Sequence, residues 1–100
     1  MFVILWEFEV KPGCEEGFEN AYSPDGDWAR LFQRDRRYRM TRLFRDYERP
    51  NVYLTLDCWE SEAAYEAFQL AHRESYAALD RATEPLTLRE TRLGAWTQPG

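Results

Sequence analysis

The stretch from Tyr53 to Phe68, YLTLDCWESEAAYEAF, changes its hydrophobic period halfway along. Up to Trp59 the apolar residues alternate with others, which is typical of a β-strand. From Ser61 onward they recur every three or four residues, as on one face of an α-helix. The Ser61 hydroxyl can accept a hydrogen bond from a free N–H group in the first turn of that helix. The stretch therefore predicts a strand that passes directly into a helix.

The remaining periodicities predict a complete small domain around this stretch. The expected elements are strands over 2–10, 38–47, 51–59 and 86–96, a helix over 14–22, a short helical segment over 27–32, and a helix that begins after Ser61. On the last helix one stripe carries Tyr65, Phe68, His72, Tyr76 and Leu79. The order β-α-β-β-α-β predicts a ferredoxin-like α+β fold, with a four-stranded antiparallel sheet and its helices on one face. One hundred residues suffice for a single domain over 1–100.

Both faces of the third strand carry large apolar residues. Val52, Leu54, Leu56 and Cys58 alternate with Tyr53, Thr55, Asp57 and Trp59. A single layer of helices covers only one face of a sheet, and bare apolar patches of several hundred Å² are uncommon on monomers. We therefore expect a homodimer that forms through the sheet face.

The composition excludes several classes of function. A net charge of −5 argues against non-specific binding of nucleic acid, although seven arginines lie between Arg34 and Arg49, where we expect ion pairs with interleaved acids. The chain begins with neither a signal peptide nor an apolar run long enough to cross a membrane, so we expect a cytoplasmic protein. In that compartment Cys14 and Cys58 stay as thiols.

His72 is the only histidine and the candidate catalytic residue, because an imidazole can act as a general base near neutral pH. Six aromatic residues are candidates for binding a flat substrate ring: Tyr22, Trp28, Trp59, Tyr65, Phe68 and Tyr76. In a domain of this size each of these side chains is equally compatible with packing in the core. For His72 the alternative is a hydrogen-bonded core or rim histidine.

Metal and nucleotide cofactors find no support in the sequence. A metal centre commonly needs three or four converging ligands, and the chain has one histidine and two distant cysteines. Its glycines form no phosphate-binding pattern. We expect no metal and no cofactor.

The sequence resembles the antibiotic biosynthesis monooxygenase family of dimeric α+β barrel proteins. The resemblance is strongest over residues 53–76, YLTLDCWESEAAYEAFQLAHRESY, and is supported by GDWARLF at 26–32 and by the first strand. The resemblance implies a dimer with a ligand cavity between sheet and helices. It also implies, for some members, oxidation of aromatic or quinol-like substrates by O2 without metal or flavin. A related branch degrades haem with an Asn, a Trp and a His. Trp59 matches that Trp, but Glu7 stands near the Asn position and His72 lies about a turn late, so haem is not expected.

The sequence and the resemblance thus predict a protein that binds a small aromatic molecule and is a candidate cofactor-independent monooxygenase. The alternative is a non-catalytic dimeric binding or accessory protein of the same fold. An open cavity sized for one ring favours the first hypothesis, and a space closed by the protein's own aromatic side chains favours the second.

Overall fold

The computed structural model describes residues 1–99 and contains one antiparallel sheet in the strand order β2-β3-β1-β4. Its strands are β1 (Phe2–Val10), β2 (Tyr38–Arg45), β3 (Val52–Trp59) and β4 (Thr87–Thr97). Its helices are α1 (Glu15–Tyr22), α2 (Asp27–Phe32), α3 (Glu62–Ala71) and α4 (Arg73–Thr83), followed by the short 3-10 helix η1 (Glu84–Leu86). This arrangement confirms the predicted ferredoxin-like α+β fold.

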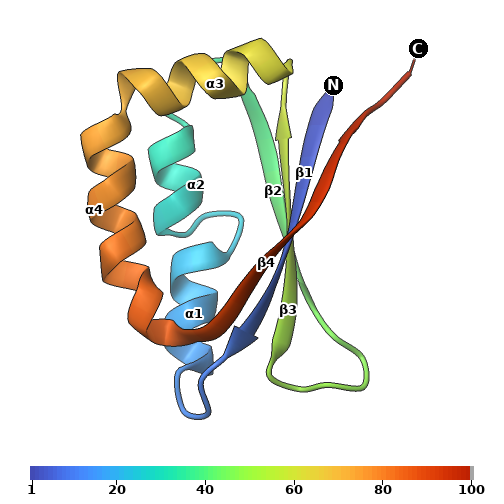
Figure 1. The fold of residues 1–100 in the computed structure, drawn as a ribbon, viewed down its shortest axis with the longest axis vertical. Coiled ribbons are helices and arrows are strands. Elements are labelled where there is room, and N and C mark those ends of the chain that lie inside the picture. The colour runs from blue at the N-terminus through green and yellow to red at the C-terminus, as the bar shows by residue number, and fades with distance from the viewer. Residues whose placement is uncertain (100) are drawn as a thin grey trace.

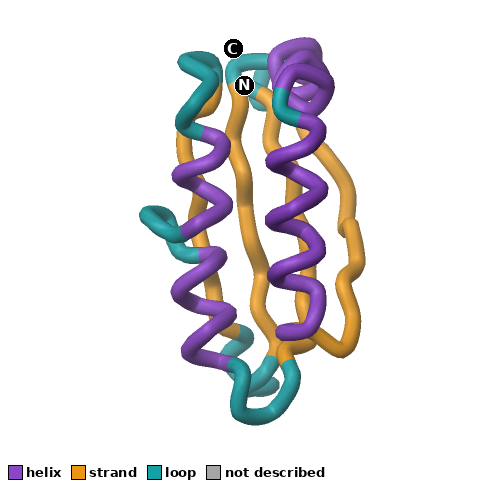
Figure 2. The backbone as a smooth tube through the Cα atoms, turned by 90° about the vertical axis from the view of Figure 1, so that its left-hand side faces the viewer, coloured by secondary structure: helices purple, strands orange, loops and turns teal. Residues whose placement is uncertain are grey.

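All the helices lie on one side of the sheet (Figure 1). Seen from that side, α1 and α2 form one column and α4 runs beside them as a second column (Figure 2). The switch of period predicted at Ser61 is confirmed: β3 ends at Trp59, and the Ser61 side chain accepts a hydrogen bond of 3.1 Å from the N–H of Ala64. Within residues 1–99, no helix is long and apolar enough to span a membrane.

The prediction of a single helix after Ser61 is wrong, because the helix is interrupted at His72 and forms two helices, α3 and α4. His72 has φ −116° and ψ 29°, outside the helical range. Figure 1 shows α3 leading away from the end of β3 and α4 turning back along the sheet. A straight helix over 62–83 would be about 33 Å long and would carry Tyr76 away from the domain. The break instead brings the Tyr76 ring within 4.9 Å of the Trp28 ring.

The inner face of the sheet packs against the helices. Directly paired residues share a face, and the inward pairs between β1 and β3 are Phe2 with Trp59, Ile4 with Asp57, Trp6 with Thr55 and Phe8 with Tyr53. Phe18, Trp59 and Phe68 are completely buried against this face. Burial of such large aromatic side chains dominates the energetics of a small core.

The outer face of the sheet is apolar in its middle and is not covered by the helices. Val3 and Leu5 of β1 lie beside Cys58 and Leu56 of β3 on this face. Trp96 remains 52% exposed, and its ring lies over Gly94, where a Cβ atom would come within 3.2 Å of it. The absence of that Cβ lets the indole lie close to the backbone of β4.

Candidate functional site

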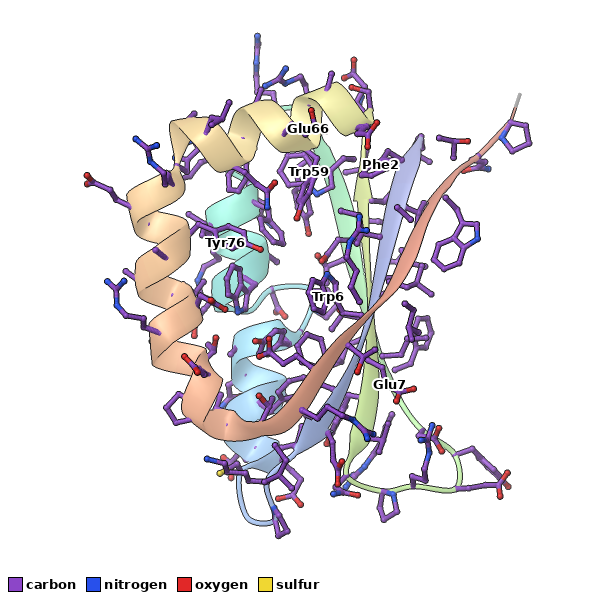
Figure 3. The ribbon with its side chains drawn as sticks, viewed as in Figure 1. Phe2, Trp6, Glu7, Trp59, Glu66 and Tyr76 are labelled. Carbon is purple, nitrogen blue, oxygen red and sulfur yellow. The ribbon has the colours of Figure 1, made fainter. Side chains whose placement is uncertain are left out.

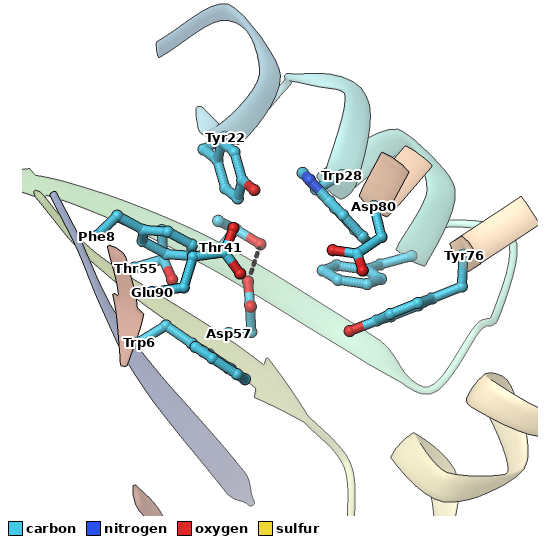
Figure 4. A pocket seen from close by; sticks show the side chains of 11 residues that line it. Trp6, Phe8, Tyr22, Trp28, Thr41, Thr55, Asp57, Tyr76, Asp80 and Glu90 are labelled. Atoms are coloured by element: carbon cyan, nitrogen blue, oxygen red, sulfur yellow. Dashed lines mark hydrogen bonds between the residues drawn. The ribbon is translucent and has the colours of Figure 1, made fainter. Parts of the chain in front are cut away.

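A cavity of about 200 Å³ lies between the sheet and helices α2 and α4. Figure 3 shows Trp6, from β1, on the helix side of the sheet facing Tyr76 of α4, whereas Glu7 points to the other side. Figure 4 shows the lining from close by. The residues that line it are Trp6, Phe8, Tyr22, Trp28, Phe32, Thr41, Thr55, Asp57, Tyr76, Asp80 and Glu90. An engineered cavity of ~150 Å³ holds benzene, so this space admits a single ring with a short substituent.

Aromatic side chains from α1, α2 and α4 form one wall of the cavity, called the aromatic wall below: Tyr22, Trp28, Phe32 and Tyr76. Trp28 and Phe32 are four residues apart on α2 and therefore lie on one face of it, with their rings 5.8 Å apart. The Tyr76 ring meets Trp28 edge to face at 4.9 Å, and the Tyr22 ring lies 6.1 Å from Trp28 on the other side. These spacings are within the usual range of favourable aromatic pairs.

Asp57 places a carboxyl group among these aromatic residues. Its Oδ1 accepts a hydrogen bond of 2.7 Å from the Thr41 hydroxyl, drawn as a dashed line in Figure 4. The Tyr38 hydroxyl lies 2.6 Å from the same Thr41 oxygen. Because Thr41 has one hydroxyl hydrogen and gives it to Asp57, Tyr38 donates to Thr41. The three side chains form a chain of hydrogen bonds that ends on the carboxylate.

Burial raises the pKa of Asp57 to about 6 from its ordinary 3.8, while the hydrogen bond from Thr41 opposes part of the rise. A carboxyl with this pKa is mostly ionised at pH 7 and is a stronger base than an exposed aspartate. Burial also raises the pKa of Tyr22 to about 12 and raises that of Tyr76. Both phenols therefore stay protonated. The Tyr22 hydroxyl donates its hydrogen to Thr83 Oγ1 at 3.3 Å, so Tyr76 is the one of the two that can donate a hydrogen bond to a negatively charged oxygen in the cavity.

The structure brings together three of the six aromatic residues proposed from the sequence. Tyr22, Trp28 and Tyr76 line the cavity. Trp59 and Phe68 are fully buried with ring centroids 5.0 Å apart, and Tyr65 lies 5.6 Å from Trp59. These three form an aromatic cluster beneath α3, and none of them is among the residues that line the cavity.

His72 lies at the corner between α3 and α4, with its ring 4.8 Å from that of Phe68. It does not line the cavity. A shallow depression at this corner is lined only by the consecutive residues 70–75. The role of His72 as a base stays a prediction, and it would need contact with a substrate outside the cavity described above.

Sequence reasoning did not single out Asp57, Asp80 or Glu90. A signal for Asp57 was present, because its strand face also carries Tyr53 and Trp59, and an isolated acid on an apolar face is unusual. Asp80 and Glu90 belong to α4 and β4 and meet the cavity only through the tertiary fold. Nothing in their local sequence indicates this.

The fold and cavity define a class of protein, the ferredoxin-like α+β domains with a cavity between the sheet and its helices. Residues 1–79 match the antibiotic biosynthesis monooxygenase family. The chain belongs to this family. No protein with a curated description matches the sequence.

Several solved structures share the fold at low sequence identity. A variant of SnoaB, a cofactor-independent oxygenase from Streptomyces nogalater, is 20% identical with a TM-score of 0.79, over 99% of this chain and 93% of that chain. A conserved protein from Methanosarcina mazei is 13% identical with a TM-score of 0.73, over 98% and 92%. PA3566 from Pseudomonas aeruginosa is 16% identical with a TM-score of 0.70, over 99% and 94%. At these identities the likeness establishes the fold alone.

The raised pKa of Asp57 predicts a specific pH dependence of stability. Between about pH 4 and pH 6 the folded protein binds a proton that the unfolded chain has lost, so the free energy of unfolding falls as pH rises through this window, by up to about 3 kcal/mol. Asp57→Asn removes this term. Urea unfolding of both proteins at pH 4 to 7 should show the variant gaining relative stability as pH rises.

Glu66→Gln is the control for the Asp57 measurement, because Glu66 is exposed on α3 and lies outside the cavity. It should leave the pH dependence of stability as in the wild-type protein. Parallel curves for the wild-type protein and Asp57→Asn would show that the carboxyl titrates as an exposed aspartate does.

Proposed function

We propose that this protein is a cofactor-independent monooxygenase of small phenolic or quinol-like aromatic molecules, with Asp57 as the general base. The observation that carries the proposal is a carboxylate of raised pKa inside an aromatic cavity of about 200 Å³. Membership of the antibiotic biosynthesis monooxygenase family supports it. The description of the structurally similar SnoaB as a cofactor-independent oxygenase agrees with this class of reaction.

In the proposed reaction the substrate itself supplies the electrons. Asp57 takes the phenolic proton, and the electron-rich phenolate passes one electron to O2. The resulting superoxide and phenoxyl radical combine to form a carbon–oxygen bond at a ring carbon that carries hydrogen. Asp57 then returns its proton to the outer peroxide oxygen. As the O–O bond breaks, Asp57 takes the ring hydrogen as a proton and returns it to the departing hydroxide. One oxygen atom remains as a quinone carbonyl and the other leaves as water.

The other side chains of the site would support these steps. Tyr76, protonated at neutral pH, can donate a hydrogen bond to the developing phenolate or peroxide. The aromatic wall keeps water from the radical pair. Thr41 holds the Asp57 carboxylate in one orientation through the 2.7 Å hydrogen bond.

The assay that tests the function follows O2 uptake with single-ring phenols and quinols, including hydroquinone, and traces labelled O2 by mass spectrometry. Hydroquinone needs a correction for spontaneous oxidation, so the rate must scale with enzyme concentration. The expected result is one labelled oxygen atom in a quinone product and one in water. Ligand binding without enzyme-dependent uptake would contradict the oxygenase and favour the binding protein.

We further propose that the outer face of the sheet forms a homodimer. The exposed Trp96 and the apolar residues Val3 and Leu5 line one shallow groove there. Charges of both signs flank it: Arg89 lies 3.5 Å from Glu9 and 3.9 Å from Glu7. A surface that is apolar at its centre and carries both signs at its edge suits a two-fold contact between identical chains.

Light scattering should therefore report twice the 12.0 kDa chain mass at micromolar concentration. Leu5→Arg, at the centre of the face, should convert the dimer to a monomer because it buries an unpaired charge. The matched control is Leu70→Arg on α3, where the side chain is already 73% exposed, and this variant should remain dimeric. A wild-type monomer, or a dimer that tolerates Leu5→Arg, would exclude this interface.

A further inference from the structure

The side chains that line the cavity include three acids and no basic residue. Asp57 from β3, Asp80 from α4 and Glu90 from β4 line it, and none of the eleven lining residues is Lys, Arg or His. Every ion pair within residues 1–99 uses other acids. The three carboxylates therefore lack a cationic side-chain partner in the described part of the chain. Asp57 is partly buried, whereas Asp80 and Glu90 are exposed to solvent.

The negative charge of Asp80 also affects the pKa of Glu90. Burial raises the pKa of Glu90, the hydrogen bond from Thr87 opposes the rise, and the negative charge of Asp80 adds to it. Figure 4 shows Asp80 and Glu90 approaching the cavity from opposite sides, with Asp57 between the strands and α2. A positively charged ligand would relieve this repulsion, and an anionic ligand would increase it.

The rings of the wall favour the same kind of ligand. Six of the eleven lining residues are aromatic, and the faces of Trp and Tyr rings attract cations. A site that combines aromatic faces with carboxylates is a common means of holding an ammonium group, because the two attractions act together.

Trp28 provides a separate indication of what else the ligand carries. The side chain is only 7% exposed, and its Nε1 is buried without a hydrogen bond of ordinary geometry in residues 1–99, although it lies near enough to the Tyr22 hydroxyl to lower the pKa of that phenol. In Figure 4 the nitrogen end of the indole turns toward Tyr22. A buried donor without a well-formed hydrogen bond is costly, and a ligand oxygen that takes the place of the Tyr22 hydroxyl beside it would satisfy it.

We propose that the cavity selects a single-ring aromatic ligand that carries both a hydroxyl or carbonyl oxygen and a protonated amine. The oxygen accepts from Trp28, and the ammonium group lies toward Asp80 and Glu90. Aromatic ligands with a carboxylate or phosphate are rejected. This inference rests on the cavity of the proposed oxygenase and names the class of its substrate.

Three probes that share one phenol ring test the selectivity by titration calorimetry at pH 7. Tyramine carries an ammonium group, 4-ethylphenol is neutral, and 3-(4-hydroxyphenyl)propionate carries a carboxylate. Tyramine should bind about tenfold more tightly than 4-ethylphenol, the scale of a screened ion pair combined with a cation–π contact. The carboxylate should bind more weakly than 4-ethylphenol.

Substitutions of Asp80 and Glu90 test whether these two acids cause the selectivity. The double variant Asp80→Asn with Glu90→Gln should bring the affinity ratio of tyramine to 4-ethylphenol close to one. Glu66→Gln removes one negative charge at an exposed site on α3 outside the cavity and should leave the ratio unchanged.

Four outcomes would each overturn the inference. They are equal binding of tyramine and 4-ethylphenol, tightest binding of the carboxylate, no binding of any probe, and an affinity ratio that is unchanged in the double variant. Binding and turnover separate the two proposals. Amine selectivity without O2 uptake would refute the oxygenase and leave the selectivity standing. O2 uptake with neutral phenols and no preference for amines would refute the selectivity and leave the oxygenase standing.

Discussion

The Asp57→Asn variant should oxidise a phenolic substrate about a hundred to ten thousand times more slowly than the wild-type protein, the usual contribution of a positioned general base. The amide has nearly the same shape as the carboxylate and still accepts the hydrogen bond from Thr41, so the cavity keeps its geometry. It cannot take the phenolic proton. The measurement is kcat from initial rates of O2 uptake, with folding checked by circular dichroism.

His72→Ala separates the two candidate bases in the same assay. Because His72 lies outside the lining of the cavity, its substitution should change kcat less than twofold. The pH profile gives a further readout, since activity that depends on Asp57 should fall below the pKa of about 6. Full activity of Asp57→Asn together with loss of activity in His72→Ala would transfer the role of base to the histidine.

The second large effect concerns the aromatic cluster beneath α3. Phe68→Ala should lower the free energy of unfolding by about 3–5 kcal/mol, because it leaves a cavity in a fully packed core. The Phe68 side chain is completely buried, with ring centroids 5.0 Å from Trp59 and 5.5 Å from Phe32. Urea unfolding at 25 °C measures the loss.

Leu70→Ala, two residues along α3, is the matched control for Phe68→Ala. Its side chain is 73% exposed, so the stability should change by no more than about 0.5 kcal/mol. If Phe68→Ala does not fold, Phe68→Leu should fold with a loss of about 1 kcal/mol. A loss below 1 kcal/mol for Phe68→Ala would contradict a tightly packed cluster.

The fold could be predicted because its signals are local. The change of period between Trp59 and Ser61 lies within a few residues, and the cap at Ser61 follows from one hydroxyl. The break at His72 was missed because the surrounding sequence, LAHRESY, contains neither Gly nor Pro and continues the apolar stripe of the preceding helix. The direction of α4 depends on the packing of Tyr76 against Trp28, which is a contact between distant segments.

The candidate site was less predictable for a related reason. Both faces of β3 carry apolar residues, so the alternation alone does not say whether Asp57 faces the helices or the outer side. The register with β1, in which Asp57 pairs with the buried Ile4, decides it. The aromatic residues were identified by type, but which of them fill the core and which border the cavity depends on where α3 ends and α4 begins.

A crystal structure of the protein with resorcinol, a phenol that O2 attacks slowly, at saturating concentration tests the substrate site most directly. We expect electron density for one ring between Trp6, Trp28 and Tyr76, with a hydroxyl oxygen within hydrogen-bonding distance of the Asp57 carboxylate. An empty cavity at saturation, or a ring bound at the His72 corner instead, would contradict the claim that Asp57 and its aromatic wall form the substrate site.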